Sequence, residues 1–430
     1  MTASQPAPFL SDDVPGLPAR RAALKLLDAV LRQGRPLEAA LAGATGAGAT
    51  GAVRGADRAL AHMIAATVLR RLPDLDALID GATARRLPDD AKARFALRIA
   101  LGQALVLGTP PHAAIATVLP LVDGGPRKLV HGVFGTVMRA KAVLPDPPNL
   151  PADVAERWTR EWGEEAVAAA GRAIAESPPL DLTLARPEAT AEWAERLGGE
   201  SFMPGHVRLP ARAVVADLPG YAEGAWWVQD VSASLPVRAL LEGWGDRSLG
   251  RVLDLCAAPG GKALQLAAAG WDVVAVDQSE SRLARLRENF ARCGLTAEVA
   301  RGDVLSWAPH APADAVLVDA PCSATGIFRR HPDVLHRAHP RFIAEMAELQ
   351  ARLLARAAEW VKPGGTLVYA TCSLERAEGE AQADRFLIDR PDYANAPPSS
   401  AGANAYARIL PQAMPGGCDG FFIARFTRNG

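Results

Sequence analysis

The sequence predicts an all-helical domain followed by an α/β domain with a mostly parallel sheet, and a small mixed α/β extension between them. Three observations lead to this fold class. Apolar residues recur at helical spacing in the first third of the chain, and short apolar runs alternate with helical stretches after residue 250. A proline-rich segment separates the two regions. Alternating strands and helices indicate a parallel sheet covered by helices on both faces.

The amino-terminal region is expected to contain a tail and then a helical domain. Residues 1–18 are rich in proline and small side chains, which favours a flexible tail. Residues 19–145 contain several apolar stripes at helical spacing, such as the stripe of Ala23, Leu27 and Val30. No run in this region alternates like a strand. We therefore expect only helices there.

Glycine and proline mark the interruptions in this part of the chain. GATGAGATGA at residues 43–52 predicts a flexible loop, and LPDPPNLP at residues 144–151 predicts a linker. Residues 152–240 then combine a long helical stretch with shorter runs of strand character. This mixture predicts a linker followed by a small α/β extension in front of the main domain.

Residues 241–430 carry the strand and helix rhythm of the main domain. Apolar runs that predict parallel strands lie at 251–255, 272–277, 297–303, 314–319 and 366–370. Helical stretches lie between them. The last apolar run, FFIARF, predicts an antiparallel strand that closes the sheet.

Composition limits the class of protein. The chain of 430 residues is 49% hydrophobic and 22% charged, as expected for a soluble protein of two or three domains. No uncharged apolar stretch of about 18 residues predicts a membrane span, and the amino terminus does not resemble a signal peptide. Five cysteines without a CxxC pair fit the reducing cytoplasm, and neither disulfides nor a metal site are expected.

The net charge of −1 hides an asymmetry. Residues 1–145 carry 18 Lys/Arg against 11 Asp/Glu, so the rest of the chain is acidic. A basic front half suggests contact with nucleic acid. Solvated helix faces would give the same excess of positive charge, so charge alone does not decide between the two.

A glycine-containing loop after the first strand of the main domain predicts a cofactor site. Its residues are Cys256, Ala257, Ala258, Pro259, Gly260, Gly261 and Lys262. Glycines allow close approach of a ligand, and the following helix presents the positive end of its dipole. The spacing is neither that of a dinucleotide fingerprint nor that of a Walker loop.

Two aspartates complete this site. Asp277 ends the second strand, where a carboxylate binds ribose hydroxyls. Asp303 follows the third strand, where it is placed to accept a hydrogen bond from an adenine amino group. Strand-end aspartates often only cap helices. The loop and both acids in register instead predict a site for S-adenosyl-L-methionine.

Two cysteines at strand ends suggest the chemistry. Cys322 lies in DAPCS and Cys372 in TCS, each just past a buried strand. Methylation of cytosine at C5 requires a thiolate that adds to C6, a group that hydrogen-bonds the base near N3, and a proton acceptor. Asp319 suits the contact with the base, and we expect Lys262 to orient it. The alternative is that the two thiols are inert and buried, as we expect for Cys256, Cys293 and Cys418.

These residues carry a family resemblance. DLCAAPGGK, VDQS, GDV, DAPCSATGIFRRHPD, YATCSLERAEGE and DGFFIARF resemble the successive motifs of the Nol1/Nop2/Sun family of RNA cytosine-5 methyltransferases. The similarity is greatest to the bacterial Sun/Fmu branch (RsmB-type), which acts on 16S rRNA. The resemblance implies a Rossmann-like class I methyltransferase domain. It also implies that Cys372 attacks C6 and that Cys322 assists removal of the proton or release of the product. The residues implied to line the cofactor and base sites are 256–262, Asp277, Asp303 and Asp319.

The helical region resembles the NusB-like domain of the same bacterial branch, on the segments DRALAHMIAATVLRR and ALRIALGQALVLGTPPHAAIATVLPLV. This implies an RNA-binding domain over residues 19–145. Arg329, Arg330 and His331 follow the Pro-Cys loop, and we expect them to contact RNA phosphate or ribose; a solvated loop is the alternative. The indoles of Trp226 and Trp227 fit either stacking on a base or packing in the core.

The sequence thus predicts an S-adenosylmethionine-dependent rRNA (cytosine-C5) methyltransferase that forms a covalent cysteine–C6 adduct with an unpaired or flipped cytosine. We expect a cytoplasmic monomer whose partner is 16S rRNA. A tRNA or DNA methyltransferase and a non-catalytic ribosome assembly factor are the alternatives. The helical front disfavours tRNA and the TCS cysteine disfavours DNA. The intact set of Cys372, Cys322 and Asp319 argues against loss of activity.

Overall fold

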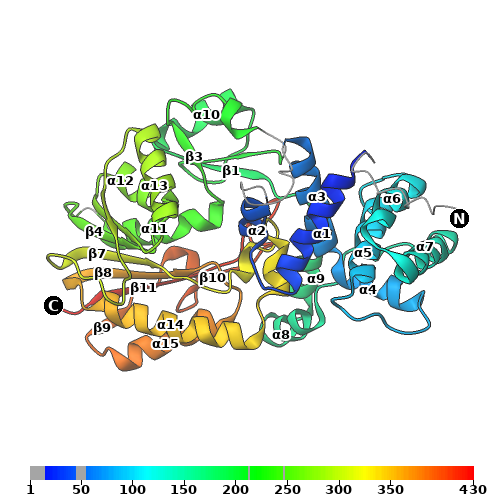
Figure 1. The fold of residues 1–430 in the computed structure, drawn as a ribbon. Coiled ribbons are helices and arrows are strands. Elements are labelled where there is room, and N and C mark those ends of the chain that lie inside the picture. Colours follow the sequence, from blue (N-terminus) through cyan, green and yellow to red (C-terminus); the bar gives the residue numbers. More distant parts are fainter. Residues whose placement is uncertain (1–14, 45–54, 212–213, 246) are drawn as a thin grey trace, which may run out of the picture. The chain divides into compact units, whose positions relative to one another are not determined.

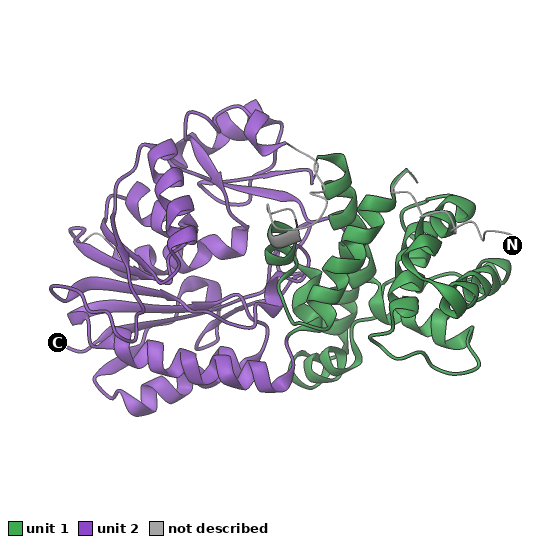
Figure 2. Ribbon diagram, in the orientation of Figure 1, with its two compact units in different colours: residues 1–175, 331–337 green, residues 176–330, 338–430 purple. Residues whose placement is uncertain are grey.

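The computed structural model divides the chain into two compact units, which Figure 2 colours separately. Unit 1 comprises Met1–Ala175 and His331–Arg337, and unit 2 comprises the remainder. The tail and the loop expected at 1–18 and 43–52 fall mostly outside the described residues. The structure describes residues 15–44, 55–211, 214–245 and 247–430.

In its described residues, unit 1 is helical, as predicted. Its α-helices are α1 (Leu17–Leu31), α2 (Leu37–Ala44), α3 (Ala56–Arg70), α4 (Leu72–Gly81), α5 (Lys92–Leu105), α6 (Pro111–Val118), α7 (Gly124–Arg139), α8 (Ala152–Trp162) and α9 (Glu164–Ala175). The apolar stripes of α1 to α7 meet in one core, because amphipathic helices stabilise one another by burying those stripes. Helix α5 is buried almost all round and carries two buried arginines. Arg94 pairs with Asp80 at 2.6 Å and Arg98 with Asp76 at 2.8 Å, so both charges are compensated.

Two segments of unit 1 lie outside the region 19–145 in which the sequence placed the helical domain. Helices α8 and α9 belong to unit 1, where Trp158 is 1% exposed. The segment before α8 is held by Asn149, whose Nδ2 donates to Asp74 Oδ1 at 2.8 Å. The second segment contains the 3₁₀ helix η5 (Pro332–His336), whose His336 ring lies 2.8 Å from the carbonyl oxygen of Leu69.

Unit 2 is built on the predicted sheet, in the order β10-β11-β8-β7-β4-β5-β6, with β9 paired to β11. Strands β4 to β8 pair in parallel with one another, and β11 is antiparallel to β8 as expected for the closing strand. The strands are β4 (Arg251–Leu255), β5 (Asp272–Asp277), β6 (Glu298–Arg301), β7 (Ala313–Asp319), β8 (Val361–Thr371), β9 (Tyr393–Asn395), β10 (Ala407–Ile409) and β11 (Phe421–Arg428).

Helices cover both faces of this sheet (Figure 1). One face is covered by α11 (Val231–Trp244), α12 (Gly261–Ala268) and α13 (Glu280–Cys293), and the other by α14 (Pro340–Ala358) and α15 (Glu380–Asp389). This is the predicted Rossmann-like arrangement. Within the described part of the chain, no helix is both long and apolar enough to cross a bilayer.

Side chains that alternate between the two faces of the sheet form two cores, one under the helices of each face. Val252 of β4 and Val368 of β8 belong to the core under α11 and α12. Their neighbours Leu253 and Leu367 belong to the core that includes α14 and α15. Successive side chains of a strand point to opposite faces, so both faces of a central strand must be apolar.

In its described residues, the extension forms a three-stranded antiparallel sheet, in the order β2-β1-β3, with one α-helix. A buried ion pair anchors it. Arg208 donates to Asp181 at 2.6 and 2.8 Å, and Asp181 also accepts the backbone N–H of Val231 at the start of α11. Its elements are β1 (Leu180–Leu184), α10 (Thr190–Leu197), β2 (His206–Leu209) and β3 (Trp226–Val228).

Candidate active site

The site lies where the order of the parallel strands reverses, between β4 and β7. From the central strand β4 the chain order runs through β5 and β6 on one side and through β7 and β8 on the other. Loops that leave the carboxyl ends of β4 and β7 therefore diverge and open a crevice, the usual ligand site of such sheets. Residues 256–262 follow β4, and residues 320–322 follow β7. The two predicted motifs thus lie at the same sheet edge.

The loop after β4 takes a backbone path that small residues permit. Cys256 has φ +62° and Gly260 has φ +110°, and α12 begins directly afterwards at Gly261. A Cβ atom at position 260 would lie 3.1 Å from Leu286, so the glycine meets both a conformational and a steric demand. The turn places Lys262 in the first turn of α12, where it is 9% exposed.

Three of the predicted cofactor residues, Cys256, Asp277 and Asp303, line one cavity of about 130 Å³. Six others line a second cavity, namely Ala257, Ala258, Pro259, Gly261, Lys262 and Asp319. Asp277 ends β5, and its two carboxylate oxygens accept the backbone N–H groups of Ala258 and Ser279 at 3.2 and 2.9 Å. Asp303 accepts the N–H of Leu305 at 3.0 Å. These bonds fix both carboxylates at the cavity wall. The lining residues of the first cavity are Cys256, Asp277, Gln278, Arg282, Gly302, Asp303, Val304, Leu305, Pro321, Leu349 and Leu353.

Asp254 lies inside β4, and no role was predicted for it although it begins the DLCAAPGGK motif. This residue is 0% exposed, and neither of its carboxylate oxygens has a hydrogen-bond partner among the described residues. Burial raises the pKa of Asp254 to about 8, and the charges of Asp319 and Asp277 add to the rise while Lys262 opposes it. A charged residue inside a buried strand was the available signal, since such residues are rarely buried without a partner.

A second cavity, of about 420 Å³, borders the same loop. Lys262 and Asp319 both line it, and the Lys262 ammonium lies 2.8 Å from Asp319 Oδ2. Burial opposes the charged form of Lys262, but the Asp319 carboxylate and, to a lesser extent, Asp254 and Cys372 raise its pKa. The lysine is therefore a fixed cation. The contact places Lys262 against Asp319, and its role in orienting that carboxylate stays a prediction.

The two cysteines meet beside this pair. Cys322 Sγ lies 3.5 Å from Cys372 Sγ, although fifty residues separate them in the chain. Both side chains are half-buried. The pKa of Cys322 is raised well above its usual value, first by its hydrogen bond with Cys372 and then by burial. The structure thus brings together the four residues that the sequence singled out for chemistry, with Cys322 held as a thiol.

The three residues expected to contact RNA lie in different environments. Arg329 is 2% exposed and donates to the carbonyl oxygen of Gly416 at 3.0 Å. Arg330 pairs with Asp230 at 2.8 Å and lines the larger cavity. His331 groups with unit 1. Arg329 therefore lies in the interior of unit 2, and sequence reasoning missed this because a short basic run gives no sign of which guanidinium is covered.

Other thiols and indoles serve packing. Burial raises the pKa values of Cys256 and Cys418 to about 12, so both stay protonated. Burial likewise raises the pKa of Cys293. Trp226 is fully buried, and Trp227 is 3% exposed with its indole N–H donated to Gln229. The structure therefore favours core packing for both indoles.

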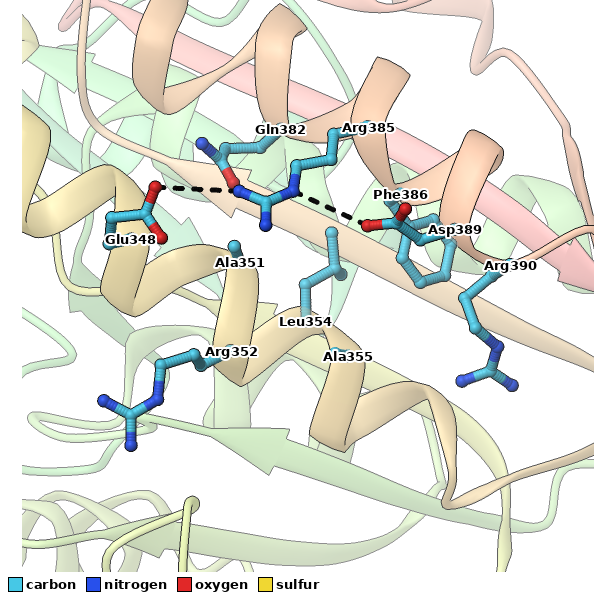
Figure 3. Close-up of a pocket in the computed structure, with 10 residues that line it drawn as sticks. All are labelled: Glu348, Ala351, Arg352, Leu354, Ala355, Gln382, Arg385, Phe386, Asp389 and Arg390. Atoms are coloured by element: carbon cyan, nitrogen blue, oxygen red, sulfur yellow. Dashed lines mark ion pairs between the residues drawn. The ribbon is translucent and has the colours of Figure 1, made fainter.

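A separate hollow of about 350 Å³ lies between α14 and α15 (Figure 3). Arg385 extends between Glu348 and Asp389 and forms ion pairs with both, at 3.6 and 3.5 Å. Its other lining residues are Ala351, Arg352, Leu354, Ala355, Gln382 and Phe386 of the same two helices, and Arg390 just after α15. None of the predicted site residues lines this hollow, so the candidate site is the sheet edge.

Comparison with known families gives two matches along the chain. Residues 246–427 match the model described as 16S rRNA methyltransferase RsmB/F, and residues 17–139 match the NusB family. The first match spans the sheet and both cysteines. The second spans α1 to α7.

Similar proteins cover nearly the whole chain. Ribosomal RNA small subunit methyltransferase B of Klebsiella pneumoniae (strain 342) is 37% identical over 405 residues, which is 87% of this chain and 90% of the relative. The protein of that name from Xanthomonas campestris pv. campestris is 35% identical over 432 residues, 95% and 97% of the two chains. The crystal structure of PH0851 matches with a TM-score of 0.71 at 23% identity, covering 96% and 99%, and supports the fold.

Proposed function

The chain belongs to the RsmB/F family of 16S rRNA methyltransferases, and from this premise we propose that it transfers a methyl group from S-adenosyl-L-methionine to C5 of one cytosine in 16S rRNA. The observation that carries the proposal is the pair of thiols 3.5 Å apart, Cys322 and Cys372, beside the ion pair of Lys262 and Asp319.

The reaction explains why two thiols are needed. C5 of cytosine is a poor nucleophile, so Cys372 first adds to C6 as a thiolate, and C5 becomes enamine-like. C5 then takes the methyl group, after which its proton must be removed so that the C5–C6 double bond re-forms and the thiolate is expelled. Cys322, held beside Cys372, assists this second half. A single cysteine would perform the attack without a neighbour for the release.

The ion pair of Lys262 and Asp319 acts on the cytosine base. Asp319 is placed near N3 of the cytosine, and a proton shared between its carboxyl group and N3 increases the electrophilic character of C6 as the thiolate attacks. Lys262 holds the Asp319 carboxylate in one orientation at 2.8 Å and presents a cation to the charge that develops. A base stacked in a duplex would hide C6 from the thiol, so the cytosine must be unpaired or flipped into the site.

The residues present fit S-adenosyl-L-methionine. Asp277 suits the ribose hydroxyls and Asp303 the adenine amino group, and both line one cavity with Cys256 and Pro321. The first turn of α12 suits the carboxylate of the methionine part. The unpartnered carboxyl group of Asp254 supports a ligand that brings a hydrogen-bond donor to this sheet edge. When bound, the cofactor supplies an electrophilic methyl group.

Ribosomal RNA is the proposed partner, bound through the NusB-like helical region. Its excess of Lys/Arg over Asp/Glu suits a phosphate backbone. The reaction takes place in the cytoplasm, where the cysteines stay reduced, and one chain carries all the residues named for it.

Bisulfite sequencing of RNA from a strain that lacks the gene tests the proposal. We expect one cytosine of 16S rRNA to lose its protection and to regain it when the gene is restored, but not when the gene carries Cys372→Ala. Unchanged protection throughout rRNA would contradict the proposal. Loss of protection in tRNA alone would show a tRNA enzyme instead.

A further inference from the structure

Glu378 joins the two loops that carry the cysteines. It ends the short helix η6 (Arg376–Glu378) after β8, and it is 0% exposed. Its Oε1 accepts the backbone N–H of Ser323 at 2.8 Å and the side-chain amide of Gln350 at 3.0 Å. Its Oε2 accepts the hydroxyl of Ser373 at 2.6 Å and the hydroxyl of Ser323. Four donors thus converge on one carboxylate.

Three of the four donors belong to the immediate neighbours of the cysteines. Ser323 follows Cys322, and Ser373 follows Cys372. The two hydroxyls lie 3.2 Å from each other, and both serines are at most 4% exposed. The Glu378 carboxylate therefore bridges the loops one residue beyond the two thiols, which themselves are 3.5 Å apart.

Other hydrogen bonds hold the Glu378 residue itself in place. Tyr369 donates its hydroxyl to the carbonyl oxygen of Glu378 at 2.8 Å, from inside β8. Gln350 of α14 donates both to Glu378 and to the carbonyl oxygen of Pro321, at 3.0 and 2.9 Å. Glu378 is thus tied to the sheet and to α14. A small shift of either loop would break one of these bonds.

We propose that Glu378 is a positioning residue of the methyl-transfer reaction, which holds the loops of Cys322 and Cys372 together so that the two thiols stay within hydrogen-bond distance. The role rests on the proposed function, because the second thiol acts only if it lies beside the first. The side chain of Glu378 is hydrogen-bonded to Ser323, Ser373 and Gln350 and not to a reacting atom. It acts through Ser323 and Ser373.

The chemistry of the donors explains the choice of a carboxylate. The N–H groups of Ser323 and Gln350 can only donate, whereas hydroxyls donate or accept. A glutamine at position 378 can keep its oxygen toward the two N–H groups and turn its NH₂ toward the hydroxyls. Glu378→Gln should therefore preserve the bridge. Glu378→Ala removes it and leaves buried donors without an acceptor.

The distance between the thiols can be tested without RNA or cofactor. Diamide accepts two electrons and two protons from a pair of thiols, which become a disulfide, and the azo group becomes a hydrazine. Peptide mass spectrometry after timed exposure of the full chain would follow the link between Cys322 and Cys372. We expect Glu378→Ala to slow this closure at least about 10-fold and Glu378→Gln to stay within about 3-fold of the native rate.

The rate of disulfide formation distinguishes the positioning role of Glu378 from the effect of its negative charge. The negative charge of Glu378 contributes to the raised pKa of Cys322, after the larger effects of Cys372 and burial. Removing that charge favours the thiolate and would by itself speed the exchange. A slower reaction in Glu378→Ala therefore reports lost geometry. Closure at the native rate would overturn the proposal.

Two further variants control for folding. Asp384→Asn changes a side chain of α15 that accepts a hydrogen bond from Tyr406, and it should close the disulfide at the native rate. Ser373→Ala removes one donor while Glu378 remains. If Glu378→Ala fails to fold in a thermal melt, Ser373→Ala replaces it as the test. A native rate in Ser373→Ala would then overturn the proposal.

Activity gives the second readout. With unmodified 16S rRNA transcribed in vitro, we expect Glu378→Ala to lower kcat about 100-fold while KM for the cofactor changes little. The fraction of protein trapped as a covalent RNA adduct per turnover should rise, and Glu378→Gln should recover most of kcat. Equal losses in both variants would overturn the positioning role. If the native chain transfers no methyl group, the proposed function fails instead, and the disulfide rate still tests the bridge.

Discussion

Replacing Asp254 with asparagine should change how the stability of unit 2 depends on pH. Burial raises the pKa of this carboxyl group to about 8, from an ordinary value of 3.8. Between these values the folded chain holds a proton that the unfolded chain has lost. The associated stability is fully present below about pH 4 and is lost as the pH rises through 8.

The size of the effect follows from the shift. One pKa unit corresponds to about 1.4 kcal/mol, so a shift of about four units gives at most about 6 kcal/mol over the whole range. Between pH 5 and pH 8 the loss from Asp254 is about 3–4 kcal/mol. Asparagine has nearly the same shape and does not ionise. The variant should therefore keep stability that the native chain loses between these two pH values.

Urea denaturation at pH 5 and pH 8, followed by tryptophan fluorescence, measures this difference. Seven of the nine tryptophans belong to unit 2, so the signal reports mainly on the unit that holds Asp254. Glu298→Gln, at an exposed position of β6, serves as the control and should follow the native chain. Parallel pH dependences for the native chain and Asp254→Asn would refute the reasoning, because they would mean that the folded carboxyl group ionises as in water.

Three other predictions follow from the same contacts. Lys262→Met should lower the single-turnover rate about 100-fold by releasing Asp319 and removing the cation; a native rate would show that the ion pair is dispensable. Asp303→Ala should weaken binding of S-adenosyl-L-methionine about 10-fold or more in calorimetry, and an unchanged Kd would remove Asp303 from the site. Burial lowers the pKa of His336 below 6.5, so unit 1 should lose stability as the pH falls below that value, because the unfolded chain takes up the proton first. His336→Gln should abolish this loss in melts followed by circular dichroism at pH 5 and pH 7, and an equal loss in both proteins would contradict it.

Much of the fold could be predicted from local patterns. Strands β4, β5, β7 and β8 contain short apolar runs, and the helices follow at the expected spacing, because a buried parallel sheet requires apolar side chains on both faces. The short strands β9 and β10 were not predicted. The closing strand β11 was predicted on the same basis. The boundaries between the domains were harder to predict. Helices α8 and α9 carry ordinary amphipathic stripes, and a stripe does not reveal which neighbour will cover it.

The candidate site could likewise be predicted only where local sequence patterns mark its residues. Cys322, Cys372, Lys262 and Asp319 were singled out by their place after strands, and the structure brings them together because strand ends share one edge of the sheet. Contacts between distant loops have no such local signal. The burial of Arg329 depends on a carbonyl group nearly ninety residues away.

Buried polar groups were the main omission. Asp254 lies inside an apolar run. The apolar pattern predicts the strand, but it gives no sign that the single acidic residue within it has a role. Glu378 belongs to a motif that the sequence analysis quoted as a whole, without a role for each residue. Its importance is visible only once Ser323 and Ser373, fifty residues apart, are seen to donate to it. Hydrogen-bond convergence of this kind is a property of the folded chain.

The most direct test of the central claim is to identify the cysteine that bonds to RNA. The native chain, Cys322→Ser and Cys372→Ser would each be mixed with unmodified 16S rRNA and S-adenosyl-L-methionine, separated on denaturing gels, and digested for peptide mass spectrometry. We expect Cys322→Ser to accumulate a nucleotide adduct on the peptide that contains Cys372, because the attack proceeds and the release fails. Cys372→Ser should form no adduct. An adduct on Cys322 in the Cys372→Ser protein, or none in Cys322→Ser while methyl transfer continues, would contradict the account.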